Sequence, residues 1–166
     1  VLWDEIAAEV AGEFPDIRWD KMLVDAMTMR MTLRPETLDT IVATNLHADI
    51  LSDLAAALAG SLGIAPTANL NPERRFPSMF EPIHGSAFDI AGKGIANPMA
   101  CVLSGALLLR SNGFGNAADA LEEAVGEAVQ ADEGRTPDIG GTARTDTAGE
   151  AVRTAPETAV DRVVAD

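Results

Sequence analysis

Two aspartates on one predicted helix are the first residues of this chain that could bind a ligand. Asp49 and Asp53 lie four positions apart, so in a helix their carboxylates share one face, with Cβ atoms about 5 to 6 Å apart. Like charges at this spacing repel, and a divalent cation would remove the repulsion. Carboxylate oxygens suit Mg²⁺ or Mn²⁺ rather than zinc. Asp25 offers a third carboxylate at the end of a predicted strand, where α/β folds gather their ligands. The simpler alternative is a solvated acidic helix face.

A second candidate site is the segment from Glu81 to Pro98. It contains His84, three glycines and Asn97, and it shows the period of neither a helix nor a strand. A loop of this composition can wrap a nucleotide, although it matches neither the dinucleotide fingerprint nor the P-loop. The alternative is a simple structured turn, in which His84 is a hydrogen-bonded loop histidine and Asp89 caps a helix.

Hydrophobic periodicity predicts helices on both sides of this loop. The first helix should end at Pro15, and the helix that carries the aspartate pair should end at Gly60. The predicted helices are Val1 to Phe14, Ala26 to Leu33, Leu46 to Leu58, Ala100 to Arg110 and Ala117 to Ala131, with a last short helix after Gly149. The fourth is almost wholly apolar and hence predicted to be buried. The fifth should turn Leu121, Ala124, Val125, Ala128 and Val129 inward.

Two apolar segments between the early helices read as strands. Ile17 to Val24 alternates and is rich in large apolar residues, and Thr40 to Thr44 is a short β-branched run that predicts a buried strand. Short extended pieces are expected between Gly60 and Pro98. Alternating helices and strands predict an α/β fold, with a seam near Gly60 where the composition changes.

Composition and charge exclude several classes of protein. The 166 residues are 47% apolar, enough for one compact unit or for parts of two. The longest near-apolar stretch, Asn97 to Leu109, is too short to span a bilayer. One cysteine, Cys101, and two histidines cannot build an internal disulfide or a structural zinc cage. A net charge of -14 would repel phosphate backbones and anionic lipids, so we expect neither nucleic-acid nor membrane binding.

The surface is also poor in lysine, since only Lys21 and Lys93 are lysines among 12 basic residues. We interpret the acidic excess as an adaptation to high salt, where a Debye length of roughly 3 Å would screen the repulsion. An acidic protein from a genome rich in G and C is the alternative.

Three stretches, read together, resemble the β-decarboxylating dehydrogenases: the 3-isopropylmalate, isocitrate, D-malate and tartrate dehydrogenases. They are Asn45 to Asp53, Gly60 to Ile64 and Glu81 to Pro98, in the order and separation of that family. The resemblance runs from Val1 to about Thr154. It implies the C-terminal half of an isopropylmalate-dehydrogenase-like three-layer α/β fold. Residues 1–59 would end the dimerisation and metal-binding lobe, and residues 60–166 would form the returning half of the nucleotide-binding lobe.

The resemblance also implies ligands for each candidate residue. Asp25, Asp49 and Asp53 match metal-binding aspartates for Mg²⁺ or Mn²⁺, with Asp25 supplied by the neighbouring subunit. An acidic residue at the adenosine ribose disfavours a 2′-phosphate, which implies NAD rather than NADP. The residues expected to contact NAD are His84, Gly85, Ser86, Ala87, Asp89 and Asn97.

The implied activity is oxidative decarboxylation of a small 2-hydroxy dicarboxylic acid in a cytoplasmic homodimer. The family takes its acid/base lysine and tyrosine, and its substrate-binding arginines, from the region that precedes the resembling part. This chain has no tyrosine, and neither lysine matches the catalytic one. We therefore expect no catalytic residue within it and no turnover from these residues alone.

Substrate choice depends on the stretch Asn69 to Phe80. It is similar to the tartrate and D-malate branch, which favours one of those two acids. A 3-isopropylmalate dehydrogenase is the alternative within the family. A non-enzymatic alternative is an acidic assembly module built on the Leu46 to Leu58 helix.

Overall fold

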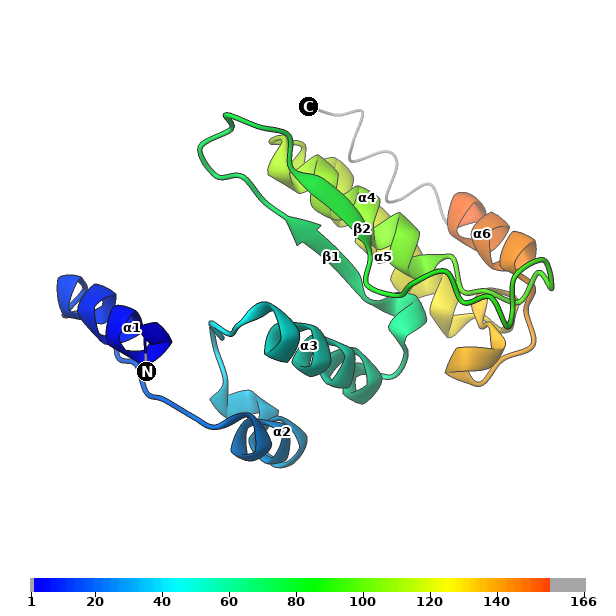
Figure 1. The fold of residues 1–166 in the computed structure, drawn as a ribbon. Helices are drawn as coiled ribbons and strands as arrows, with labels where there is room; N and C mark the ends of the chain where they lie inside the picture. Colours follow the sequence, from blue (N-terminus) through cyan, green and yellow to red (C-terminus); the bar gives the residue numbers. More distant parts are fainter. Residues whose placement is uncertain (1, 156–166) are drawn as a thin grey trace. The chain divides into compact units, whose positions relative to one another are not determined.

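The computed structural model describes residues 2–155 and divides the chain into two compact units, Val1–Ala48 and Asp49–Asp166 (Figure 1). The division falls within helix α3 (Asn45–Ala59). The predicted lobe boundary after residue 59 stays a prediction, and residues 156–166 of the second predicted lobe lie outside the described residues.

The first unit contains helices α1 (Leu2–Glu13) and α2 (Val24–Leu33) and the 3-10 turn η1 (Pro35–Thr37). Both predicted helices are confirmed, although α2 begins before the predicted Ala26. Pro15 follows α1 closely, as expected for a residue without a backbone N–H. The predicted apolar stripe of α1 is at least 48% exposed at every position: Leu2, Ile6, Val10 and Phe14.

Two segments predicted as strands, Ile17 to Val24 and Thr40 to Thr44, are not strands. The first runs as irregular backbone into α2, and the second joins η1 to α3 without a ladder partner. The second was also predicted to be buried, but Val42 is 76% exposed. Apolar and β-branched residues suit a pleated surface, yet a strand forms only where its N–H and C=O groups pair with another strand. No residue between 2 and 155 supplies that pairing to either segment.

Helix α3 confirms the prediction for Leu46 to Leu58 and carries the aspartate pair. Its alanine-rich sequence favours the helix. Gly60 ends it with a φ of +128°, a conformation that residues with side chains rarely adopt. Within the predicted apolar stripe Leu51 is buried, whereas Ile50 and Leu58 are about half exposed.

The described part of the second unit contains one sheet, an antiparallel pair of β1 (Pro66–Asn69) and β2 (Met79–Pro82). Pro66 pairs with Pro82, and Asn69 pairs with Met79. The 3-10 turn η2 (Leu62–Ile64) precedes β1. Both strands pack against helix α4 (Met99–Ser111), which lies alongside them in Figure 1. These strands are the extended pieces expected between Gly60 and Pro98.

Helices α4, α5 (Gly115–Gln130) and α6 (Thr145–Thr154) build the core of the second unit. Helix α4 packs against α5, and α6 packs against α5 and the 3-10 turn η3 (Asp132–Gly134). The core cluster consists of Met99, Ala124, Val125, Ala128, Ala143, Ala148 and Val152. The predicted inward face of α5 is therefore confirmed, with Leu121 and Val129 half-buried.

Two helix predictions need correction. Helix α6 starts at Thr145 instead of after Gly149, because Gly149 lies within a helix whose apolar residues Ala148 and Val152 are buried. Helix α4 is not wholly buried, since Leu108 near its end is 45% exposed. None of the helices in residues 2–155 is long and apolar enough to cross a membrane.

Candidate functional site

The aspartate pair lies on α3, where Asp49 and Asp53 are about one turn apart and both exposed. The hydroxyl of Ser52 donates to the backbone carbonyl oxygen of Asp49 at 3.0 Å and not to either carboxylate. Within residues 2–155 no side chain donates a hydrogen bond to either carboxylate. Two neighbouring, unpaired carboxylates are a donor set that fits Mg²⁺ or Mn²⁺.

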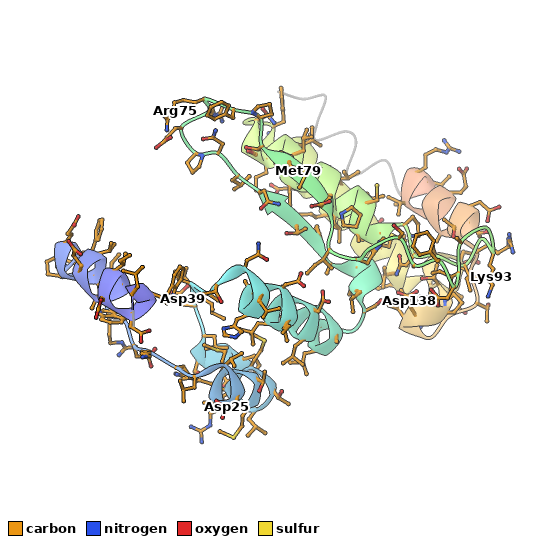
Figure 2. The ribbon with its side chains drawn as sticks, in the orientation of Figure 1. Asp25, Asp39, Arg75, Met79, Lys93 and Asp138 are labelled. Carbon is orange, nitrogen blue, oxygen red and sulfur yellow. The ribbon has the colours of Figure 1, made fainter. Side chains whose placement is uncertain are left out.

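Asp25 lies in the first turn of α2 and is exposed (Figure 2). Its Oδ1 accepts from the backbone N–H of Ala26 at 2.9 Å, as acidic residues at helix N-termini often do. Asp25 belongs to the first compact unit, and the α3 pair belongs to the second. Across residues 2–155 no three His, Cys, Asp or Glu side chains are grouped to hold a metal ion. One chain thus presents two of the three predicted ligands on one helix.

The predicted nucleotide loop follows β2 and begins at His84, whose half-buried ring places Nδ1 3.0 Å from the carbonyl oxygen of Gly85. Two turns follow, closed by Ile90 N–H to Ala87 O at 3.0 Å and by Lys93 N–H to Ile90 O at 3.1 Å. The side chains of Ser86 and Asp89 are exposed. This part of the loop therefore presents its polar groups to solvent, where a ligand can reach them.

The end of the loop is held by the N-terminus of α6. Thr145 donates its backbone N–H to Gly94 O at 3.0 Å and its hydroxyl to Ala96 O at 2.6 Å. The guanidinium of Arg144 lies so close to Gly94 that an added Cβ would overlap its Nη2. Gly94 also has a φ of +64°. The positive φ therefore favours glycine at this position, whereas the guanidinium is the far end of a flexible side chain and could move aside.

Asn97, at the end of the loop, is only 8% exposed, and both ends of its amide are hydrogen bonded. Its Nδ2 donates to Oδ2 of Asp138 at 3.0 Å, and its Oδ1 accepts from the backbone N–H of Met99 at 3.0 Å. A carboxamide has two N–H groups and two lone pairs on its oxygen. One N–H and one lone pair of this nearly buried amide therefore have no hydrogen-bond partner within residues 2–155.

Asp138 lies in the 3-10 turn η4 (Pro137–Ile139) of the second unit (Figure 2). Its hydrogen bonds join three segments of this unit. Its Oδ2 also accepts from Ser61 Oγ at 2.5 Å, and its Oδ1 accepts from Thr136 Oγ1 at 2.5 Å. Burial raises the pKa of the Asp138 carboxyl, but hydrogen bonds from Ser61, Thr136 and Asn97 hold it below its ordinary value of 3.8. The ionised carboxylate can only accept hydrogen bonds.

Sequence reasoning missed Asp138 and Ser61. The only local signal at Asp138 is its position after Thr136 and Pro137, which is typical of a turn. Its partners at positions 61 and 97 are distant in the sequence, and nothing in their residue types indicates that they meet.

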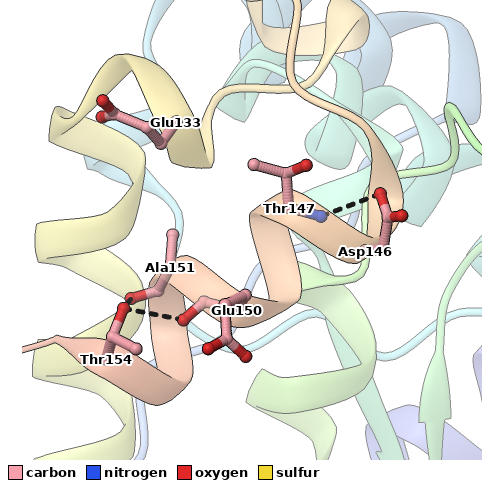
Figure 3. A pocket seen from close by; sticks show the side chains of 6 residues that line it. All are labelled: Glu133, Asp146, Thr147, Glu150, Ala151 and Thr154. Atoms are coloured by element: carbon pink, nitrogen blue, oxygen red, sulfur yellow. Dashed lines mark hydrogen bonds between the residues drawn. The ribbon is translucent and has the colours of Figure 1, made fainter.

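An open hollow of about 450 Å³ lies beside α6 (Figure 3). The residues that line it are Glu133, Asp146, Thr147, Glu150, Ala151 and Thr154. Some of their polar groups are satisfied locally: the Thr147 N–H donates to Asp146 Oδ1 at 2.9 Å, and the Thr154 hydroxyl donates to Glu150 O at 2.9 Å. None of the predicted site residues lines this hollow.

Comparison with known sequences gives a match over nearly the whole chain. The family model described as "Isocitrate/isopropylmalate dehydrogenase" matches residues 1–152. A protein of Agrobacterium vitis described as "Probable tartrate dehydrogenase/decarboxylase TtuC'" is 71% identical over 152 residues, covering 92% of this chain and 42% of the relative. "D-malate dehydrogenase [decarboxylating]" of Escherichia coli (strain K12) is 47% identical over 155 residues, covering 90% of this chain and 43% of the relative. The chain thus spans less than half the length of these curated relatives.

Comparison with solved structures points to the same family as the sequence comparison. The crystal structure of isocitrate dehydrogenase from Methylococcus capsulatus matches with a TM-score of 0.83 at 43% identity, covering 98% of this chain and 45% of that one. The predicted fold class and the resemblance noted in the sequence are therefore confirmed. These comparisons do not test the individual metal and nucleotide contacts, which stay predictions.

Proposed function

Because the chain belongs to the isocitrate/isopropylmalate dehydrogenase family, we propose that it supplies the metal-binding and NAD-binding half of a decarboxylating dehydrogenase. The proposed substrate is a small 2-hydroxy dicarboxylic acid of the D-malate or tartrate type. The observation that carries this proposal is the high identity to the Agrobacterium vitis relative. The matched stretch is long enough to include both the aspartate pair and the glycine-rich loop.

The α3 pair is the proposed metal site. Asp49 and Asp53 would hold Mg²⁺ or Mn²⁺ together with Asp25 of the partner subunit in a homodimer. Their exposure and their freedom from other hydrogen-bond donors within residues 2–155 support this role. A bound divalent cation supplies Lewis-acid chemistry, since it lowers the pKa of a coordinated substrate hydroxyl and stabilises the negative charge that remains when CO₂ leaves. The helix keeps the two carboxylates on one face, so little ordering is needed when the ion binds.

The loop from His84 to Asn97 is the proposed adenosine site. Asp89 would accept hydrogen bonds from the ribose hydroxyls, Gly85, Ser86 and Ala87 would offer backbone groups, and His84 would lie near the adenine. Ile90 follows Asp89 where a basic residue would be needed to bind a 2′-phosphate. We therefore propose NAD rather than NADP as the nucleotide.

Asn97 is proposed to contact the adenine itself. Its amide keeps one N–H and one lone pair after its internal hydrogen bonds to Asp138 and Met99. An amide that offers both a donor and an acceptor can pair with the donor and acceptor on an adenine edge.

The groups that move protons and bind the substrate carboxylates are not proposed within this chain. It contains no tyrosine, and its lysines do not match the family's catalytic lysine. We expect these groups from the part of a family enzyme that this chain does not match, and no turnover from the 166 residues alone.

The test is a chimera in which this chain replaces the aligned segment of the Agrobacterium vitis relative. We expect the chimera to reduce NAD with D-malate or tartrate, and to need Mn²⁺ or Mg²⁺. The 166-residue chain, assayed beside it, should show no turnover. A folded dimeric chimera without NAD reduction for either acid, where the parent relative is active, would contradict the proposal.

A further inference from the structure

Asp138 has no assigned role, yet it is the acceptor for three side chains from three segments of the second unit. Those side chains are nearly or fully buried: Ser61 and Asn97 are each 8% exposed, and Thr136 is 0% exposed. The Ser61 hydroxyl also accepts from the backbone N–H of Gly63 at 2.9 Å. Asp138 thus links Ser61, which lies just after α3, to Asn97 at the end of the nucleotide loop.

The main effect of this carboxylate on Asn97 is on the direction of its amide. The two ends of a side-chain amide have almost the same shape but opposite hydrogen-bonding character. An ionised carboxylate can only accept, so Asp138 draws Nδ2 of Asn97 toward itself. Oδ1 then faces the backbone N–H of Met99, which can only donate. Both contacts select the same one of the two amide orientations.

The amide orientation decides which base edge it can pair with. Adenine presents an amino donor beside a ring nitrogen that accepts. An amide pairs with this edge when its oxygen faces the amino group and its N–H faces the ring nitrogen. Hypoxanthine carries a carbonyl acceptor in place of the amino group and an N–H in place of the ring acceptor. A base with this reversed pattern needs the amide turned over.

We propose that Asp138 is a positioning residue that fixes the orientation of the Asn97 amide and thereby sets the preference for adenine in the dinucleotide. This inference rests on the proposed NAD site. Asp138 itself acts through Asn97 and need not touch the nucleotide. Without Asp138, only the Met99 N–H still orients the amide, so the turned orientation that suits the reversed base is opposed less strongly and the preference for adenine weakens.

The test compares NAD with nicotinamide hypoxanthine dinucleotide as substrates of the chimera. The wild-type chimera should prefer NAD in kcat/KM by roughly tenfold or more, the scale of one paired base contact. Asp138→Ala should bring this ratio toward one, mainly through the KM of the dinucleotide, while kcat with NAD and the KM of the 2-hydroxy acid change little. A merely destabilising change would lower the active fraction and leave the ratio as it was.

Ser61→Ala is the matched control, because it removes one donor to the same carboxylate and leaves the contact between Asp138 and Asn97 in place. It should keep the preference for NAD. If Asp138→Ala does not fold, Asp138→Ser replaces it, since the shorter hydroxyl cannot take the place of the carboxylate oxygen that meets Nδ2.

The outcomes separate the two proposals. An unchanged ratio in the Asp138 variant, equal loss of the ratio in Ser61→Ala, or no preference in the wild type would overturn the positioning role while NAD reduction persists. Absence of all NAD reduction would overturn the proposed function, and the positioning role would be withdrawn with it.

Discussion

Replacing Gly63 with alanine should weaken the second unit by displacing the hydrogen-bonded group around Asp138. A Cβ at position 63 would lie 2.6 Å from Asp138 Oδ2 and 2.7 Å from Asn97 Cβ. Carbon atoms in favourable contact are about 3.5 to 4.0 Å apart, so both neighbours must move. Asn97 Cβ is attached to the backbone and cannot rotate away. Overpacking of this kind costs about 1 to 3 kcal/mol.

The displacement would also lengthen or break a hydrogen bond to the charged carboxylate of Asp138. If Asp138 moves away from Ser61 or Asn97, a further loss of about 1.5 to 3 kcal/mol is expected. When both losses occur, we therefore expect Gly63→Ala to lower the free energy of unfolding by roughly 2.5 to 6 kcal/mol. Gly126→Ala is the matched control, because Gly126 lies within α5 with no atom within 4 Å of its added Cβ. This substitution should instead stabilise the helix by about 0.5 to 1 kcal/mol.

The assay is a urea titration of the 166-residue chain followed by far-ultraviolet circular dichroism. With a slope of about 1 to 3 kcal/mol per molar urea, the Gly63→Ala midpoint should fall by on the order of 1 M. The Gly126→Ala midpoint should rise or stay where it is. A Gly63→Ala midpoint equal to or above that of the wild type would refute the packing described around Asp138.

Two further predictions concern single carboxylates. In the chimera, NADP should be a poorer substrate than NAD, because its 2′-phosphate would face the like charge of Asp89. Such a contact costs several kcal/mol. Salt weakens the repulsion, because Asp89 is exposed. Asp89→Asn should narrow the ratio of the two kcat/KM values, and an unchanged ratio would contradict the ribose contact. Asp138 has a pKa below its ordinary value of 3.8 in the folded chain, so its stabilising effect is complete above that value and is lost as the pH falls through the folded pKa. The wild type should exceed Asp138→Asn in free energy of unfolding at neutral pH, and urea titrations below about pH 4 should show this difference shrinking; a difference that grows in acid would reverse the assigned sign.

The helices could be predicted from the sequence because their signal is local. The apolar spacing of α1, α3 and α5 and the breakers Pro15 and Gly60 lie within or next to each element. The predicted strands failed because strand formation depends on a partner that local composition does not reveal. Val42 has the residue type of a buried strand, yet it is exposed.

The residues of the candidate site also divide into those that a local sequence signal indicates and those that only the fold brings together. The aspartate pair could be found from a spacing of four on a helix, and the loop from its glycines and histidine. The role of Asp138 could not be found, because its partners Ser61 and Asn97 meet it only through the packing of the second unit. The two hydrogen bonds of the Asn97 amide likewise depend on contacts that the fold creates.

The assignment of the α3 aspartate pair as the metal site can be measured directly in the chimera. The measurement is Mn²⁺-dependent NAD reduction by the chimera carrying Asp49→Asn, compared with Asp39→Asn, which removes the same charge from an exposed coil outside the predicted site. We expect Asp49→Asn to lower turnover by more than about 100-fold with the dimer intact, since even outer-shell partners of metal ligands cost 10- to 100-fold. Asp39→Asn should stay near the wild type. Unchanged Mn²⁺-dependent turnover in Asp49→Asn would contradict the assignment of the aspartate pair as the metal site.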